Sequence, residues 1–235
     1  LCAQGYPVVS IDYRLGLKGV KKVGVLQANL VEHAIHLAVE DLYSATNFLI
    51  DNADSFGIEP DNLVIAGSSA GAISVLQADW EIANGHSIAS VLPEGFRYAG
   101  VMSFSGAIFS REGGIRYRKA EPAPTLFMHG VDDRIVKYGQ IWFFNLRFAG
   151  TSKIVPTFEK HDYNYNVLRY KGNGHEISMS MVKTFEEQIR FLETNVVGND
   201  KRTVDALIDD PSIPRPKWGK ATTDDLYKGQ LDLSK

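Results

Sequence analysis

The chain contains the stretch Leu63-Val64-Ile65-Ala66-Gly67-Ser68-Ser69-Ala70-Gly71, in which a short apolar run passes directly into a turn of small residues. An uninterrupted apolar run of this length is typical of a strand that is buried on both faces of a sheet. Ala70 to Asn84 then has the composition and apolar spacing of a helix. The stretch therefore predicts a strand, a tight turn and a helix, the repeating unit of a parallel α/β sheet.

The turn has the form Gly-x-Ser-x-Gly, with Ser69 at its centre. Between a strand and a helix, this pattern is typical of a nucleophile elbow, which holds a serine hydroxyl above the end of the sheet. The helix start adds N–H groups and a favourable dipole for developing negative charge. Ser69 is therefore the candidate nucleophile, and the N–H of Ala70 is a candidate oxyanion donor. Ser68, its neighbour, is the alternative nucleophile. The alternative without a catalytic role is a plain glycine-rich turn.

Two further candidates follow later predicted strands. Thr125 to His129 leads into a turn that contains Asp132 and Asp133, and His175 lies in a glycine-rich turn after a strand at Tyr165 to Tyr170. The carboxyl ends of parallel strands share one edge of a sheet, so these side chains are expected near Ser69. A histidine can take a serine proton near neutral pH, and a carboxylate can orient the histidine. The four histidines without a preceding strand end are interpreted as structural: His33, His36, His86 and His161.

The rest of the chain continues the alternation of strands and helices. We predict further strands at Pro7 to Asp12 and Tyr98 to Phe104, and further helices at Val31 to Asn52, Tyr138 to Phe148 and Glu176 to Asn195. This order favours an α/β fold whose mostly parallel sheet has helices on both faces. Residues 1–197 form the predicted catalytic domain. Residues 198–235, rich in acidic pairs and prolines, form a predicted extended C-terminal arm or weakly ordered tail.

Composition narrows the classes of partner. Of the 235 residues, 44% are hydrophobic and 23% are charged, as in an ordinary globular domain. The net charge is -3 and the basic residues are scattered, so we expect no nucleic-acid partner. No apolar run reaches the length of a membrane span. Cys2 is the single cysteine and cannot form an internal disulfide. A cytoplasmic and an exported protein both fit, and the oligomeric state stays open.

These elements resemble the α/β-hydrolase superfamily, in particular its esterase/lipase or carboxylesterase-like branch. The serine, aspartate and histidine candidates appear in the order used by that fold. The stretches that carry the resemblance are Gly5 to Arg14, Glu40 to Leu42, Asn52 to Ile58, Pro60 to Gly71 and His129 to Val136. In this family the acid is the fifth residue of a His-Gly-x-x-Asp-x-x-Val run, which implies a catalytic triad of Ser69, His175 and Asp133.

The same resemblance places three aromatic residues, Trp80, Phe109 and Trp142, where family members often build an acyl pocket. Core packing explains each of these residues equally well. The resemblance implies no metal and no organic cofactor.

One family feature is expected upstream of this sequence. The family's first strands and a His-Gly-Gly-Gly-type oxyanion loop precede the Gly5 to Arg14 segment. We therefore expect the natural protein to be longer at its N-terminus, and we infer no compartment from the first residues.

The leading functional hypothesis is a serine esterase that cleaves a small or carbohydrate-linked acyl ester through an acyl-enzyme. Two other hypotheses use the same fold. One is a non-catalytic binding protein, and the other is an acyltransferase that uses the same three residues.

Overall fold

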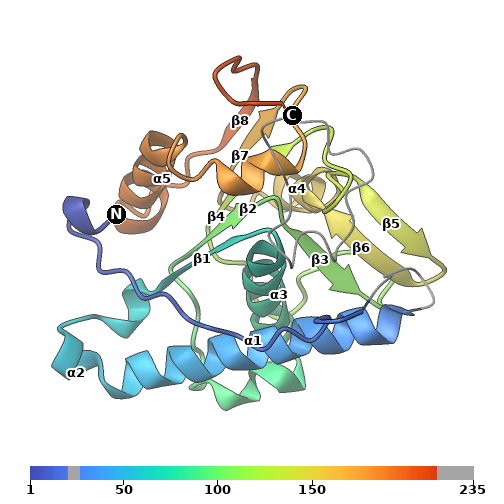
Figure 1. Ribbon diagram of the computed structural model, residues 1–235. Helices are drawn as coiled ribbons and strands as arrows, with labels where there is room; N and C mark the ends of the chain where they lie inside the picture. The colour runs from blue at the N-terminus through green and yellow to red at the C-terminus, as the bar shows by residue number, and fades with distance from the viewer. Residues whose placement is uncertain (21–26, 216–235) are drawn as a thin grey trace.

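A parallel sheet of five strands forms the centre of the computed structural model, which describes residues 1–20 and 27–215 (Figure 1). Its order is β1-β2-β4-β7-β8, and every neighbouring pair is parallel. The strands are β1 (Val64–Ser68), β2 (Gly100–Phe104), β4 (Thr125–Gly130), β7 (Tyr165–Tyr170) and β8 (Val204–Ile208). The predicted parallel sheet is confirmed. All five strands end at the same edge, and the predicted turn residues follow β1, β4 and β7.

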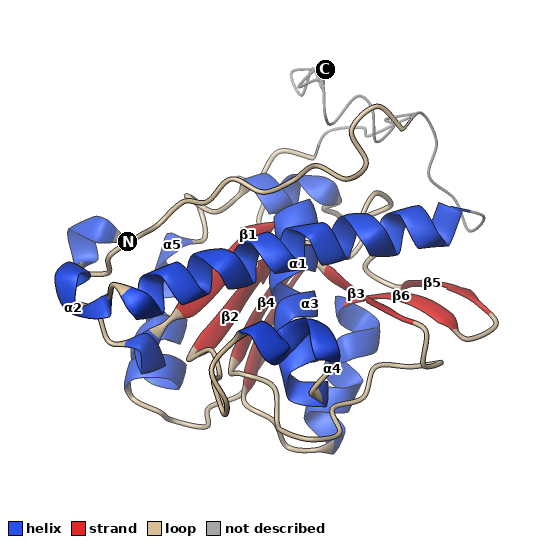
Figure 2. Ribbon diagram, turned by 90° about the horizontal axis from the view of Figure 1, so that it is seen from below, coloured by secondary structure: helices blue, strands red, loops and turns tan. Residues whose placement is uncertain are grey.

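Helices cover both faces of this sheet, as predicted (Figures 1 and 2). The helices on one face are α1 (Ala28–Asp51), α3 (Ala70–Asn84) and α4 (Thr151–Lys160). The other face carries α5 (Phe185–Phe191) and a π-helical segment, Leu192–Val197. Shorter helices lie in the connections: α2 (Ala53–Phe56) and the 3-10 helices Cys2–Gln4, Pro60–Asn62, Ser87–Val91 and His175–Met179.

Two apolar cores explain why the strands are apolar without alternation. Val101 and Phe127 belong to the core beneath α1, α3 and α4. Their chain neighbours Met102 and Leu126 belong to the core beneath α5. Successive side chains of a strand point to opposite faces, so a strand between two helical layers needs apolar residues at both parities.

A second sheet of three antiparallel strands corrects one prediction. It consists of β3 (Ala107–Ser110), β6 (Leu146–Gly150) and β5 (Gln140–Phe143), in the order β3-β6-β5. The helix predicted at Tyr138 to Phe148 is wrong, because this segment forms the β5–β6 hairpin. Its aromatic and branched residues favour strands, and Phe144-Asn145 closes the hairpin with Phe144 at φ 50°.

The N-terminal segment corrects a second prediction. Residues 6–15 have no regular structure, so the strand predicted at Pro7 to Asp12 is wrong. Val8 and Val9 are 54% and 59% exposed. A strand is held by hydrogen bonds to a neighbouring strand, and among the described residues none pairs with this segment.

The C-terminal part departs from the predictions in two ways. The helix predicted at Glu176 to Asn195 is divided into the 3-10 helix at His175–Met179, α5 and the π-helical segment. The hydroxyl of Ser180 donates to a backbone carbonyl next to this break, in competition with regular helix hydrogen bonds. In the predicted arm, β8 pairs with β7, so the arm begins as part of the sheet. Residues 216–235 of that arm lie outside the described residues, as do 21–26.

The described part of the chain has no helix that is both long enough and apolar enough to cross a bilayer.

Candidate active site

Ser69 lies between β1 and α3, at the carboxyl end of the sheet. Its backbone has φ 53° and ψ -115°, a conformation that non-glycine residues seldom adopt and that costs free energy. The N–H of Ser69 donates to the carbonyl of Phe104 at the end of β2, 2.9 Å away, which holds this turn against the sheet. A Cβ at Gly67 would lie 2.2 Å from the carbonyl oxygen of Gly71. The turn therefore requires glycine at position 67.

His175 meets Ser69 from the turn after β7. Its Nε2 lies 2.8 Å from the Ser69 hydroxyl oxygen, and the residue is only 2% exposed. The turn before His175 packs closely on the end of β4, because a Cβ at Gly130 would lie 2.2 Å from the Gly174 carbonyl oxygen. This close approach brings the residues that follow β4 and β7 together.

Asp133 completes the arrangement from the turn after β4. One carboxylate oxygen, Oδ2, accepts a hydrogen bond from Nδ1 of His175 at 2.8 Å. The other, Oδ1, accepts from the backbone N–H groups of Ile135 at 2.9 Å and Val136 at 3.1 Å. Burial alone would raise the pKa of Asp133, but hydrogen bonds from His129 and His175 outweigh burial and lower it. The buried carboxyl is therefore ionised at neutral pH.

Two alternatives left by the sequence lie elsewhere. Asp132 is exposed, whereas the Asp133 side chain contacts His175. The Ser68 hydroxyl donates to the carbonyl of Ser178 at 2.5 Å. The structure thus brings Ser69, His175 and Asp133 together.

Ala70 is the first residue of α3. Its N–H is one of the N-terminal donors that have no partner within a helix, and it directly follows Ser69 in the chain.

One residue at this site was not identified from the sequence. His129, the fifth residue of β4, places its Nε2 3.3 Å from Oδ2 of Asp133, and both side chains are fully buried. The available signal was its place as the first residue of the His-Gly-x-x-Asp-x-x-Val run, four residues before Asp133 at the end of a buried strand. Buried strand residues are usually core residues, so this position alone did not indicate a polar contact.

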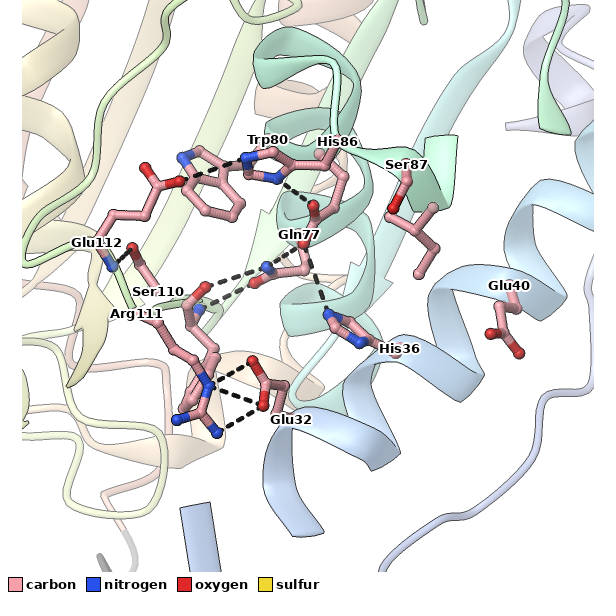
Figure 3. A pocket seen from close by; sticks show the side chains of 13 residues that line it. Glu32, His36, Glu40, Gln77, Trp80, His86, Ser87, Ser110, Arg111 and Glu112 are labelled. Atoms are coloured by element: carbon pink, nitrogen blue, oxygen red, sulfur yellow. Dashed lines mark hydrogen bonds and ion pairs between the residues drawn. The ribbon is translucent and has the colours of Figure 1, made fainter. Parts of the chain in front are cut away.

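The predicted pocket residues lie apart from these three. Trp80 and Phe109 line a cavity of about 570 Å³ between α1 and α3, and none of Ser69, His175 or Asp133 lines it (Figure 3). Trp142 is 60% exposed on β5, with the Arg147 guanidinium 5.1 Å from its ring centroid. Their role in an acyl pocket stays a prediction.

The cavity holds a second polar cluster, which we call the Glu81 cluster: Glu81, His86 and Glu112 (Figure 3). Nδ1 of His86 bonds to Glu81, and Nε2 lies 3.4 Å from Glu112. Gln77 donates to Glu81 at 2.7 Å. Of the histidines interpreted as structural, His36 and His86 line this cavity, and His33 and His161 are exposed. In residues 1–20 and 27–215, no group of His, Cys, Asp or Glu side chains could hold a metal ion.

Sequence comparison identifies esterases. Residues 1–81 match the model of the BD-FAE family, a match that includes Ser69 but ends before Asp133 and His175. The chain is 39% identical over 75 residues to Gut esterase 1 of Caenorhabditis briggsae. The aligned residues make up 32% of this chain and 12% of Gut esterase 1. The chain therefore matches only a small part of that relative's length.

Structure comparison identifies the same kind of fold. Esterase 2 of Thermogutta terrifontis has a TM-score of 0.52 and 16% identity, over 78% of this chain and 69% of that one. A truncated carbohydrate esterase from gut microbiota has a TM-score of 0.50 and 12% identity, over 80% of this chain and 73% of that one. In the sequence of its first 81 residues and in its α/β fold, the chain is similar to esterases of the α/β-hydrolase type.

Proposed function

We propose that this protein hydrolyses a carboxylic ester through an acyl-enzyme, with Ser69 as nucleophile, His175 as general base and Asp133 as the acid that orients the base. One observation carries the proposal. A continuous line of hydrogen bonds runs from the Ser69 hydroxyl through both nitrogens of His175 to Asp133, with 2.8 Å at each step. The match to an esterase family over residues 1–81 supports the same reaction class.

The tautomer of His175 follows from its partners. Ionised Asp133 can only accept, so Nδ1 of His175 carries the proton and Nε2 presents a lone pair to the Ser69 hydroxyl. As Oγ attacks the ester carbonyl, its proton passes to Nε2. His175 then returns this proton to the departing alcohol, which leaves Ser69 acylated. Water repeats the sequence: its proton goes to Nε2 and its oxygen attacks the acyl carbon. The bond from that carbon to Oγ then breaks, the carboxylic acid leaves, and Ser69 takes its proton back from His175.

The helix start supplies the electrostatic part. The ester carbonyl oxygen becomes negative during each attack, and the N–H of Ala70 at the N-terminus of α3 is suited to stabilise it. We propose a small or carbohydrate-linked acyl ester as substrate. One of the structures with a similar fold is a carbohydrate esterase, and on that ground acylated carbohydrates are the compounds to assay first.

A serine-directed probe tests the proposal on the 235-residue chain. We expect turnover of p-nitrophenyl acetate and covalent labelling by a fluorophosphonate, because labelling requires an activated serine. Both are expected to be lost in Ser69→Ala and retained in the matched control Ser68→Ala. Absence of labelling and turnover both in this chain and in the natural protein with its full N-terminus would overturn the esterase proposal and favour a binding protein. Ester products formed with an added alcohol acceptor would instead favour acyl transfer.

A further inference from the structure

His129 has both of its ring nitrogens engaged inside the protein. Nε2 lies 2.9 Å from the carbonyl oxygen of Val136, and Nδ1 lies 2.9 Å from the hydroxyl oxygen of Thr151. A carbonyl only accepts, so Nε2 carries a hydrogen, while the threonine hydroxyl is the hydrogen-bond partner of Nδ1. The residue is fully buried. These contacts therefore give His129 a defined donor at Nε2.

That donor also faces the carboxylate of Asp133. Nε2 of His129 lies 3.3 Å from Oδ2, the same oxygen that accepts from Nδ1 of His175 at 2.8 Å. Val136, whose carbonyl accepts from His129, donates its own N–H to Oδ1 of the carboxylate. His129, Asp133 and Val136 thus form a closed ring of contacts, and His175 attaches to it at Oδ2.

The carboxylate needs such contacts in order to keep its orientation. The terminal torsion of an aspartate side chain is broad, so the plane of the carboxylate is set by its hydrogen-bond partners. The backbone donors fix Oδ1. At Oδ2, the two imidazole partners are His175, which accepts and returns protons in the proposed reaction, and His129, which does not. His129 stands on β4, in the middle of the five-stranded sheet, so it is a rigid reference for that oxygen.

We propose that His129 is a positioning residue for the esterase reaction: its Nε2–H holds Oδ2 of Asp133 where that oxygen orients His175. This proposal rests on the proposed function, but His129 itself touches neither Ser69 nor the substrate. Its effect on turnover passes entirely through Asp133.

The first test removes and restores the donor. His129→Leu keeps an apolar side chain at the buried position but has no donor, and we expect a loss of about 10²-fold in kcat, the scale of a small misplacement of a catalytic group. His129→Gln carries an amide N–H at a similar distance from the backbone and is expected to restore most of this loss. Thr151→Val leaves the imidazole but removes the hydrogen-bond partner of its Nδ1, which helps to hold the ring in place, and should lose part of the activity. Full activity in a folded His129→Leu protein would overturn the proposal.

A double-substitution cycle separates positioning from a general structural role. In an Asp133→Asn background the carboxylate is already gone, so adding His129→Leu should change kcat by less than about twofold. His129→Leu should still lower the free energy of unfolding in this background, because the contacts of His129 with Val136 and Thr151 are lost there too. An equal loss of kcat in both backgrounds would show that His129 does not act through Asp133.

A readout without turnover keeps this proposal distinct from the esterase proposal. The Nδ1–H proton of His175 in protein labelled with ¹⁵N-histidine should give a downfield NMR signal, because it bonds to a buried carboxylate. We expect this signal to shift or vanish in His129→Leu and to persist in His129→Gln. An unchanged signal in His129→Leu would refute the positioning role even if the chain proves to be no esterase. If the signal shifts in His129→Leu but the wild-type chain has no esterase activity, only the esterase proposal is refuted.

Discussion

Two groups that pair a histidine with carboxylates lie near opposite ends of α3. They contain similar side chains, but their histidines have different partners. At the start of the helix, His175 lies between a hydroxyl and a carboxylate, and it is 2% exposed. In the cavity near the other end, His86 lies between two carboxylates, and its side chain is 31% exposed. Only the first arrangement joins a histidine to a serine hydroxyl.

Burial adds to this difference. Removal of water strengthens the interaction between His175 and Asp133, whereas in the Glu81 cluster Glu81 is buried but His86 and Glu112 are 31% and 27% exposed, so that water screens their charges. A histidine beside a carboxylate is therefore not by itself a sign of catalysis. The third partner and the exclusion of water distinguish the two groups.

The comparison is tested most strongly by removing the charge of Asp133. Asp133→Asn should lower kcat by about 10⁴-fold, because the amide favours the wrong tautomer of His175. The control Asp132→Asn removes the same charge from the exposed neighbour and should leave p-nitrophenyl acetate turnover within about twofold. An inactive Asp132→Asn with an active Asp133→Asn would reverse the assignment of the acid.

Asp79, the other carboxylate on α3 beside Glu81, shows what burial does without a histidine partner. Asp79 accepts from the backbone N–H of Ala123 at 3.2 Å, and burial raises its pKa from 3.8 to about 6. The folded protein therefore keeps a proton that the unfolded chain releases, so this group's contribution to stability falls as pH rises from about 4 to about 6. At about 1.4 kcal/mol per pKa unit, the fall is about 3 kcal/mol.

Asp79→Asn should remove this pH dependence. The measurement is urea unfolding of wild type and variant at pH 4 and pH 7, in which the difference in unfolding free energy between the two proteins should change by about 3 kcal/mol. The same difference at both pH values would show that Asp79 is ionised at little cost in the folded protein.

The Glu81 cluster should matter for stability and not for turnover. Glu81→Gln weakens the contact with His86, and we expect a loss of about 2 kcal/mol in the free energy of unfolding, the usual size for a hydrogen bond to a charged group. The kcat for p-nitrophenyl acetate should stay within about twofold of wild type. A loss of turnover comparable with that of Asp133→Asn would connect the cavity to the reaction and break the distinction between the two groups.

The smallest expected effect concerns acid unfolding. The pKa of Asp133 is lower in the folded protein, since the hydrogen bonds from His129 and His175 outweigh the effect of burial. Its contribution to stability is thus complete above the unfolded pKa of about 3.9 and is lost as pH falls through the lower folded value. We expect the free energy of unfolding, followed by circular dichroism between pH 2 and pH 5, to fall less steeply with decreasing pH in Asp133→Asn than in wild type. The same pH dependence in both proteins would mean that the pKa of Asp133 is equal in the folded and unfolded states.

Local patterns predicted the sheet well where a strand is buried on both faces. The apolar run before Ser69 and the run from Thr125 formed strands because either face of the sheet offers an apolar layer. The segment from Tyr138 to Phe148 was predicted as a helix, and it forms a hairpin against β3. Pro7 to Asp12 had a strand-like composition, but among the described residues no strand pairs with it. Composition shows which faces of a strand can be buried, but pairing depends on a neighbour that is often distant in the chain, as β3 is from β6.

The sequence alone determined the serine turn, since a nucleophile between a strand and a helix needs small residues at fixed spacing over a few positions. It also placed Asp133 and His175 at strand ends. Only the tertiary structure decided which carboxylate faces His175, that Trp80 and Phe109 border a cavity that Ser69 does not line, and that His129 lies 3.3 Å from the Asp133 carboxylate. Each of these depends on the direction of side chains from distant segments, and direction is set by how strands and helices pack rather than by the order of residues along the chain.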